Sequence, residues 1–200
     1  MNSSIKEKIN GTAIKLFLDR GYAQVTIKDI CEACGITKPT FYKYAGSKEN
    51  LILDLYDITI HQLLIDNYLF LKTATHYEQL LLVFHTLISE TAKYGPDLFS
   101  QMFISNLTSD HHSLDMRENL TKLCVAIIEE SQQAGEIGVK GDAAAIYRGI
   151  AHMFTGYECL WCIKKGAYEW EAEFFESLEE LLDVREDLKK TDTKGRKAGK

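Results

Sequence analysis

The sequence predicts an all-α protein of about nine helices, with a three-helix head at the N-terminus and a larger helical body behind it. Three observations predict this fold class. Apolar residues recur at helical spacing throughout, and no segment shows the period of two that a half-buried strand needs. Only two prolines stand in 200 residues, so long helical stretches remain uninterrupted. The apolar share is 46%, which is enough for a substantial core.

The first predicted helix covers residues 4–20, where Ile9, Ala13 and Phe17 recur at a spacing of four. Gly21 ends this helix, and residues 22–25 connect it to the next one. Nothing in the sequence separates this helix from the small head, so we expect it to pack across the two helices that follow.

Two short helices with clear start signals come next. Thr26 precedes the first and has Asp29 three residues later, which is the spacing of a capping box. Gly35 ends this helix because glycine readily adopts the left-handed conformation of a helix C-terminus. Thr37 caps the second helix, with Pro39 in its first turn, where a missing N–H costs nothing. Helices joined by about four residues around a glycine cross steeply, which predicts a helix-turn-helix.

The second of these helices, residues 38–44, offers groups that suit DNA. Phe41 is its main apolar anchor, which leaves lysines, hydroxyls and a phenol for phosphate oxygens and base edges. A further helix begins after Ser47, where Lys48 could hold a second phosphate. A solvated polar helix is the alternative, and it is the simpler interpretation of Lys43 taken alone. The residues expected to contact DNA are Thr26, Lys28, Thr37, Lys38, Pro39, Thr40, Tyr42, Lys43, Tyr44 and Lys48.

This stretch resembles the N-terminal module of the TetR family of bacterial repressors, over about the first quarter of the chain. The resemblance implies that Thr40 and Tyr42 lie on the recognition helix and that Tyr42 and Lys48 touch phosphates. It also implies that residues 38–40 approach bases. Ala45 departs from the family pattern, which usually has a phenylalanine there, and so leaves the tilt of the recognition helix open. The matching residues are Gly21-Tyr22, Thr26-Ile27, Ile30 to Thr37, Thr40 to Tyr44 and Ser47 to Leu51.

Charge is distributed unevenly along the chain. Residues 1–50 hold eight basic residues (Lys/Arg) and five acidic ones (Asp/Glu). Residues 51–188 hold nine basic and twenty-three acidic residues, and residues 189–200 hold six basic residues and one acidic residue. A mildly basic head on an acidic body orients a protein on DNA. We therefore expect a DNA-binding domain over 1–47, a ligand-binding and dimerisation domain over 48–188, and a basic, disordered tail over 189–200.

The body is predicted to consist of six helices, over residues 48–71, 76–93, 97–107, 114–134, 142–165 and 170–190. The helix over 97–107 is apolar on most sides, so we expect protein to surround it or an internal cavity to border it. No secretory signal is evident, and no apolar run approaches the ~18 residues of a membrane span. These features favour a cytoplasmic protein without membrane contact.

The last two helices are expected to pair two copies of the chain. Small residues alternate with large ones in the first, and the second carries a broad apolar face. Two such helices from each copy form a four-helix bundle across a two-fold axis, which is also what the TetR resemblance implies. The alternative is that a monomer uses these faces for its own core. The expected interface residues are Phe154, Phe174, Phe175, Leu178, Leu181 and Leu182.

The remaining helices are expected to enclose a pocket for a small apolar or aromatic ligand. An aromatic stripe at helical spacing is more often plain core, so that alternative stays open for each residue. For His152 on an apolar helix, a hydrogen-bonded core histidine is the simpler interpretation. The candidate ligand residues are Met102, Phe103, Tyr147, His152, Tyr157 and Trp161.

Five cysteines form the pairs Cys31/Cys34 and Cys159/Cys162, with Cys124 alone. The pairs are too far apart for a zinc ribbon, so we expect buried, free thiols, with redox sensing and metal binding as alternatives. Adjacent His111 and His112 are expected in an exposed polar loop. No metal and no cofactor are predicted.

The sequence thus predicts a homodimeric, sequence-specific regulator of transcription. We expect a repressor that leaves a palindromic operator on double-stranded DNA when a small-molecule effector binds the body. One alternative keeps the DNA-binding head but places the body under the control of a protein partner. A helical enzyme is the remote alternative, because no catalytic constellation is evident and the runs Glu129-Glu130 and Glu179-Glu180 are interpreted as solvated faces.

Overall fold

The computed structural model describes residues 2–52 and 75–190, with side chains from residue 5 onward. In these ranges the chain forms seven α-helices, the start of another over residues 48–52 and two single-turn 3-10 helices, and it has no strand, so the all-α prediction is confirmed and the expected helix number is close. An isolated antiparallel bridge joins Ile137 to Val184. The described residues divide into two compact units, 2–52 with 89–115 and 75–88 with 116–190. No helix in the described ranges has the length and apolar character that crossing a bilayer requires.

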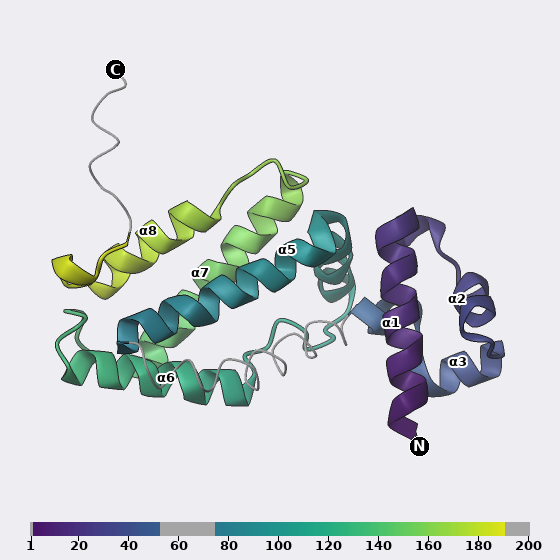
Figure 1. The fold of residues 1–200 in the computed structure, drawn as a ribbon, viewed down its shortest axis with the longest axis horizontal. Helices are drawn as coiled ribbons and strands as arrows, with labels where there is room; N and C mark the ends of the chain where they lie inside the picture. Colours follow the sequence, from purple (N-terminus) through teal and green to yellow (C-terminus); the bar gives the residue numbers. More distant parts are fainter. Residues whose placement is uncertain (1, 53–74, 191–200) are drawn as a thin grey trace. The chain divides into compact units, whose positions relative to one another are not determined.

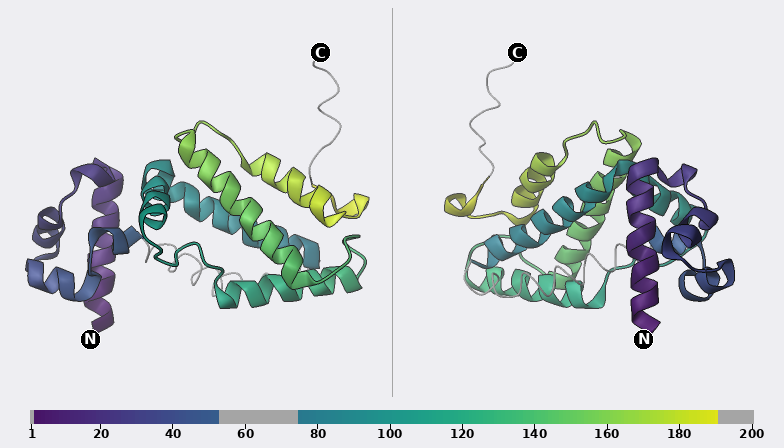
Figure 2. Two further views of the ribbon diagram at one scale, coloured as in Figure 1. Left: turned by 180° about the vertical axis from the view of Figure 1, so that it is seen from behind. Right: turned by 45° about the vertical axis from the view of Figure 1, so that its right-hand side comes forward.

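The head contains α1 (Asn2–Arg20), η1 (Tyr22–Gln24), α2 (Ile27–Cys34) and α3 (Lys38–Ala45). Both α2 and α3 lie beside α1, and α3 runs across the direction of α1 (Figures 1 and 2). The side chains that hold these helices together are almost completely buried, and α1 contributes residues four positions apart, on one face of the helix. This core consists of Ile9, Ala13, Phe17, Val25, Ile30, Cys31, Cys34, Phe41, Ala45, Leu51 and Ile52.

The predicted caps of the helix-turn-helix are confirmed. At the start of α2, the hydroxyl of Thr26 accepts the N–H of Asp29 at 3.2 Å, and the carboxylate of Asp29 accepts the N–H of Thr26 at 2.7 Å. Gly35 ends α2 in the left-handed conformation, with φ 65°. Thr37 then caps α3 by accepting the N–H of Thr40 at 3.4 Å. Local sequence signals alone therefore place both helices.

The body begins with α5 (His76–Thr108), where the sequence predicts two helices. Gly95 interrupts α5 with a non-helical φ of 76°, and Pro96 follows it, so the two expected segments are present on either side of a kink. The expectation that protein surrounds the second segment on most sides is wrong for part of it. Ile104 is 52% exposed and Leu107 is 86% exposed, although Met102 is buried.

Three further helices complete the described body: α6 (Glu118–Gln133), α7 (Ala143–Ile163) and α8 (Glu171–Leu182), followed by η3 (Glu186–Leu188). The last helix is shorter than the expected 170–190 because Asp183 turns the chain with φ 52°. Residues 48–52 are helical, as expected for a helix that starts at Lys48. The rest of that helix, from 53, and the tail from 191 lie outside the described residues.

An aromatic cluster joins α7 and α8 to the first part of α5. The ring centroids of Phe84, Phe154 and Phe174 are mutually 5.1–5.5 Å apart. Trp170 packs edge-on against Phe154 at 5.3 Å. Edge-to-face and tilted pairs at these distances are the favourable arrangements of aromatic rings. The cluster therefore packs α7 and α8 against the first part of α5 in a single core.

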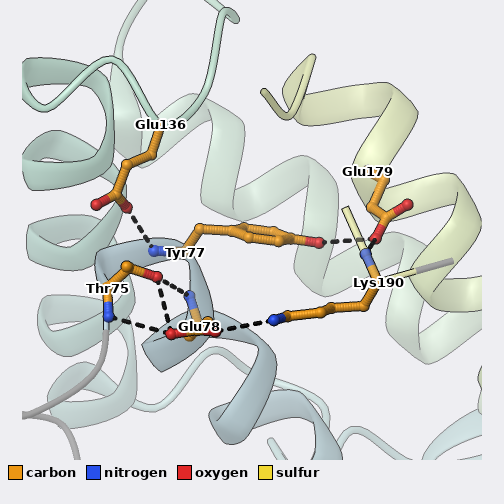
Figure 3. Close-up of polar contacts among 6 residues, drawn as sticks. All are labelled: Thr75, Tyr77, Glu78, Glu136, Glu179 and Lys190. Carbon is orange, nitrogen blue, oxygen red and sulfur yellow. Dashed lines mark hydrogen bonds and ion pairs between the residues drawn. The ribbon is translucent and has the colours of Figure 1, made fainter. Parts of the chain in front are cut away.

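A polar network lies at the start of α5 (Figure 3). The N–H of Tyr77 donates to Glu136 at 2.8 Å, and its hydroxyl donates to Glu179 at 3.4 Å. Glu179 also accepts the backbone N–H of Lys190 at 2.7 Å. The interpretation of Glu179-Glu180 as a solvated face is wrong for Glu179, which is 2% exposed, because these donors satisfy its carboxylate inside the fold.

Candidate nucleic-acid interface

The outer surface of α3 is polar and accessible. Tyr42 is 53% exposed, whereas Phe41 beside it is completely buried. Lys38, Pro39 and Lys43 are also exposed, and Thr40 is half-buried. The buried anchors Phe41 and Ala45 therefore hold α3 against the head while its hydroxyl, phenol and ammonium groups remain available to a ligand outside.

Packing beneath the surface restricts two of these side chains. The ring of Tyr42 lies edge-on to the ring of Phe41, with centroids 5.6 Å apart. The hydroxyl oxygens of Thr37 and Thr40 are 2.9 Å apart, across the first turn of α3. Side chains that are held in place lose less conformational entropy when they bind. The N-terminal turn of α3 is thus a preorganised set of donors of the kind that binds phosphate and base edges.

On α2, Thr26 and Lys28 are exposed but engaged with neighbours. The hydroxyl of Thr26 donates to Asp29 at 2.6 Å, and hydrogen bonds from Thr26 lower the pKa of the Asp29 carboxyl. Lys28 lies 3.6 Å from Glu32 in a solvent-exposed ion pair, which screens its charge only weakly. In this arrangement, Thr26 fixes the start of α2 and Lys28 keeps its ammonium at the surface.

The two remaining predicted DNA contacts are partly covered. Tyr44 is half-buried, and the ammonium of Lys43 lies 5.4 Å from its ring centroid. Lys48 is half-buried as well, and its ammonium donates to the backbone carbonyl of Tyr22. That Tyr42 and Lys48 touch phosphates stays a prediction.

The cysteines lie in the packed interior. Cys31, Cys34, Cys124 and Cys162 are buried free thiols, and Cys159 is half-buried. Burial raises the pKa of the Cys31 thiol and raises the pKa of the Cys124 thiol to about 12. Raised thiol pKa values disfavour the reactive thiolate. Across the described ranges, no three His, Cys, Asp or Glu side chains come together as a metal site would require.

The candidate ligand residues differ in burial. Met102 and Tyr147 are buried, and Phe103, Tyr157 and Trp161 are half-buried. The hydroxyl of Tyr147 is hydrogen-bonded to Cys124 on α6, whereas that of Tyr157 pairs with Ser177 on α8 at 2.9 Å. The two tyrosines on α7 therefore face different helices.

His152 is exposed, so the interpretation of this residue as a core histidine is wrong. It stands on a face of α7 that no other described helix buries, and the apolar spacing alone did not reveal this. A hollow of about 550 Å³ lies where α6 leads into α7, and none of the candidate ligand residues lines it. Its lining is mainly polar, with Glu129, Gln132, Gln133, Gly141, Asp142 and Ala143.

The predicted interface residues fall into two groups. Leu181 is 44% exposed, whereas the other five are at most 6% exposed and belong to the core of their own chain. The accessible apolar surface of α7 lies elsewhere, on Gly149, Gly156, Leu160 and Ile163, with Leu160 45% and Ile163 65% exposed. The seven-residue spacing of the two glycines is the sequence signal that indicates this face, because residues seven apart lie on the same side of a helix.

Comparison with known proteins assigns the head. Residues 9–55 match the family model described as bacterial regulatory proteins, tetR family. The uncharacterized HTH-type transcriptional regulator YerO of Bacillus subtilis is 48% identical over 48 residues, which are 24% of this chain and 17% of that protein. The HTH-type transcriptional regulator EthR of Mycobacterium tuberculosis is 41% identical over 54 residues, 27% of this chain and 25% of EthR. The chain thus aligns with about a quarter or less of the length of these curated relatives.

Solved structures are similar over most of the chain. FadR of Thermus thermophilus, a TetR-family repressor solved with lauroyl-CoA, has a TM-score of 0.72 and 24% identity over 90% of this chain and 96% of that one. The fatty acid degradation regulator FadR of Bacillus halodurans has a TM-score of 0.65 and 17% identity over 88% of this chain and 94% of that one. At these identities the likeness concerns the fold.

Proposed function

Because residues 9–55 carry the DNA-binding domain of the TetR family of bacterial regulatory proteins, we propose that this protein is a dimeric, sequence-specific regulator of transcription. The observation that carries the proposal is the outer face of α3, where Tyr42 and Lys43 are exposed on a helix anchored by the buried Phe41. The relatives of the head, YerO and EthR, are named transcriptional regulators, which favours a transcription factor over an enzyme.

In this proposal each chain places α3 in a major groove of double-stranded DNA. Thr40, Pro39 and Lys38 approach base edges, and Tyr42 and Lys43 bind phosphates. Thr26 caps α2 and Thr37 caps α3, so these two residues fix where the helices begin. Lys28 and Tyr44 border the contact. A dimer presents α3 twice, so the operator is a palindrome whose half-sites lie about one helical turn apart, roughly 34–36 Å.

The exposed face of α7 supports the dimer. Gly149 and Gly156 lie seven residues apart, and an added Cβ would meet open space at either position. Leu160 and Ile163 continue the same face toward the end of the helix. Small residues let a second helix approach closely, and the exposed apolar ones gain from burial. Sedimentation of Ile163→Glu at micromolar concentration should therefore show a shift from dimer to monomer.

The body is proposed to bind a small apolar ligand that releases the operator. The solved FadR of Thermus thermophilus holds lauroyl-CoA, which carries a long apolar chain, on the same fold. Such a ligand shifts the protein away from DNA only if it binds the DNA-incompatible conformation more tightly. The domain division proposed is residues 1–47 for DNA and 48–188 for the ligand and the partner copy.

DNA binding is tested by incubating the full chain with a pool of random duplexes and sequencing what it retains. A palindromic consensus is the expected result. On the recovered duplex, Tyr42→Phe and Lys43→Met should weaken binding to all sequences alike, and Lys43→Met should reduce the salt slope by about 0.9 per protomer. Lys140→Met removes an exposed lysine from the body and serves as the control, with no expected change. Failure to enrich any sequence at low salt would refute the proposal.

A further inference from the structure

The outer face of α7 is exposed along the whole helix. Positions three and four apart fall on one side of a helix, since each residue turns it by about 100°. The exposed positions of α7 follow this spacing from the first turn to the last, and α7 lies in front of the first part of α5 when the body is seen from behind (Figure 2). Arg148 borders the face, and Cys159 lies half-buried within it. The exposed members of the face are Ala145, Gly149, His152, Gly156, Leu160 and Ile163.

The chemistry of the outer face of α7 favours a second copy of the chain as its partner. A two-fold interface brings the same surface of both copies together, so a residue near the axis meets its own copy. A charged residue there would face its own sign, whereas the alanine, glycines, leucine and isoleucine of this face carry no charge. An added Cβ at Gly149 or Gly156 would meet open space, so the backbone of a second helix can approach closely. His152 is the member of the face that gains a proton near neutral pH.

His152 stands close to the middle of this face. It lies two positions before the midpoint between Ala145 and Ile163, and Gly156 lies two positions after that midpoint. In an antiparallel pair of helices centred there, each imidazole therefore lies opposite the partner's Gly156, where no side chain fills the space. At 1.5 Å per residue, the two imidazoles are then roughly 6 Å apart along the helices. Pairing the two copies thus encloses both histidines near one another.

His152 also differs from other histidines of the chain in its surroundings. His85 lies 2.8 Å from Glu171, and His112 lies 3.0 Å from Asp115. Acid strengthens such contacts, because the protonated imidazole attracts the carboxylate. His152, by contrast, makes no ion pair with any carboxylate in the part of the chain that the structure describes. A proton on this residue therefore gains nothing from its own chain.

The charged groups on the helices packed against α7 do not change this. On α6, Lys122 is paired with Glu118. On α8, neither Glu176 nor Glu180 makes an ion pair with the imidazole of His152. A charge on His152 would therefore be balanced by water in the separate chain, and pairing two chains would remove that water.

We propose that His152 makes the pairing of two copies through α7 sensitive to acid, so that the dimer forms with neutral imidazoles and separates when they are protonated. This inference rests on the proposed function, in which two chains pair through this face. In the pair, a protonated His152 would lose its water and face a second positive imidazole, with Arg148 of each copy at the border. Each of these effects disfavours the charged form. The separate chain therefore binds more protons than the pair does, and falling pH favours it.

Sedimentation of the full chain at pH 7.5 and at pH 5.5 tests the inference. A histidine with an ordinary pKa of about 6.5 that stays neutral in the dimer weakens it by up to about tenfold at pH 5.5, and the dimer holds two such residues. We therefore expect the dimer dissociation constant to rise by roughly 10- to 100-fold between the two pH values. His152→Gln keeps a polar side chain of similar size that does not titrate, and its dissociation constant should be the same at both. His112→Gln removes an exposed histidine outside α7 and should respond as the wild type does.

The outcomes separate this inference from the dimer itself. A wild-type chain that is dimeric with the same dissociation constant at both pH values would overturn the role of His152. The same holds if His152→Gln responds to acid as strongly as the wild type. Either result leaves the dimer of the proposed function intact. A wild-type chain that stays monomeric at pH 7.5 and high micromolar concentration would instead refute that dimer, and the inference with it.

Discussion

Two helices of this chain begin with the same capping box in different surroundings. At α2, Thr26 and Asp29 bond each other on an exposed surface. At α5, Thr75 and Glu78 do the same, with the hydroxyl of Thr75 accepting the N–H of Glu78 at 3.2 Å. The second box is embedded in further contacts, because Lys190 pairs with Glu78 at 2.9 Å and Glu136 accepts the N–H of the intervening Tyr77 (Figure 3).

The difference separates two uses of polar groups. In the head, caps complete the short helices locally, and the polar groups of α3 are left on the outside, where they can bind a partner. In the body, the carboxylates of Glu136 and Glu179 are turned inward and satisfy donors from distant parts of the chain. A buried polar group without a partner costs stability, whereas an exposed one costs little. We therefore expect changes in the body network to act on stability and changes on α3 to act on binding.

The largest effect should come from Glu136→Ala. It leaves the buried N–H of Tyr77 without its acceptor near the positive end of α5, so the free energy of unfolding should fall by about 1–3 kcal/mol. Urea unfolding of the full chain measures this loss. Glu129→Ala removes an exposed carboxylate from α6 and should change stability by less than about 0.5 kcal/mol. Equal losses for the two variants would contradict the proposed role of burial.

The two caps allow a matched comparison of smaller size. Thr26→Ala and Thr75→Ala each remove a hydroxyl that accepts a helix N–H, which costs about 1 kcal/mol. Thr26→Ala should also reduce DNA affinity of the folded protein, because α2 supports α3, whereas Thr75→Ala should not. Urea unfolding and duplex titration measure the two quantities, and Thr→Ser at each position should restore most of both. Reduced DNA affinity in both variants would remove the distinction between the two regions.

The sequence predicts the head in detail because its determinants are local. Thr26, Gly35 and Thr37 act on groups within five residues of themselves, so spacing alone places α2 and α3. Phe41 is predicted as an anchor for the same reason, since a helix of eight residues offers few alternatives. What spacing could not predict in the head is the contact of Lys48 with Tyr22, which are 26 positions apart in the chain.

The body is less predictable because its polar partners are distant in sequence. Glu179 resembles its neighbour Glu180 in every local respect, yet one is buried and the other exposed. The burial of Glu179 depends on two donors that are distant in the sequence. These are the hydroxyl of Tyr77, 102 positions away, and the backbone N–H of Lys190. The residues Phe154, Phe174 and Leu178 illustrate the same limit, since a broad apolar face is equally suited to a partner copy and to the chain's own core.

The smallest expected effect concerns acid. Hydrogen bonding to Lys190 lowers the pKa of Glu78 below its ordinary value of 4.5. A carboxyl with a depressed pKa in the folded state stabilises the protein above its unfolded pKa, and this contribution is lost as pH falls through the folded value. Stability should therefore decline below about pH 4.5, partly through this group. Lys190→Met removes the main cause and should make the decline shallower, while Lys140→Met should leave it unchanged. Thermal melting between pH 7 and pH 3 measures both, and an identical acid limb in the two variants would show that the contact between Glu78 and Lys190 does not contribute to stability.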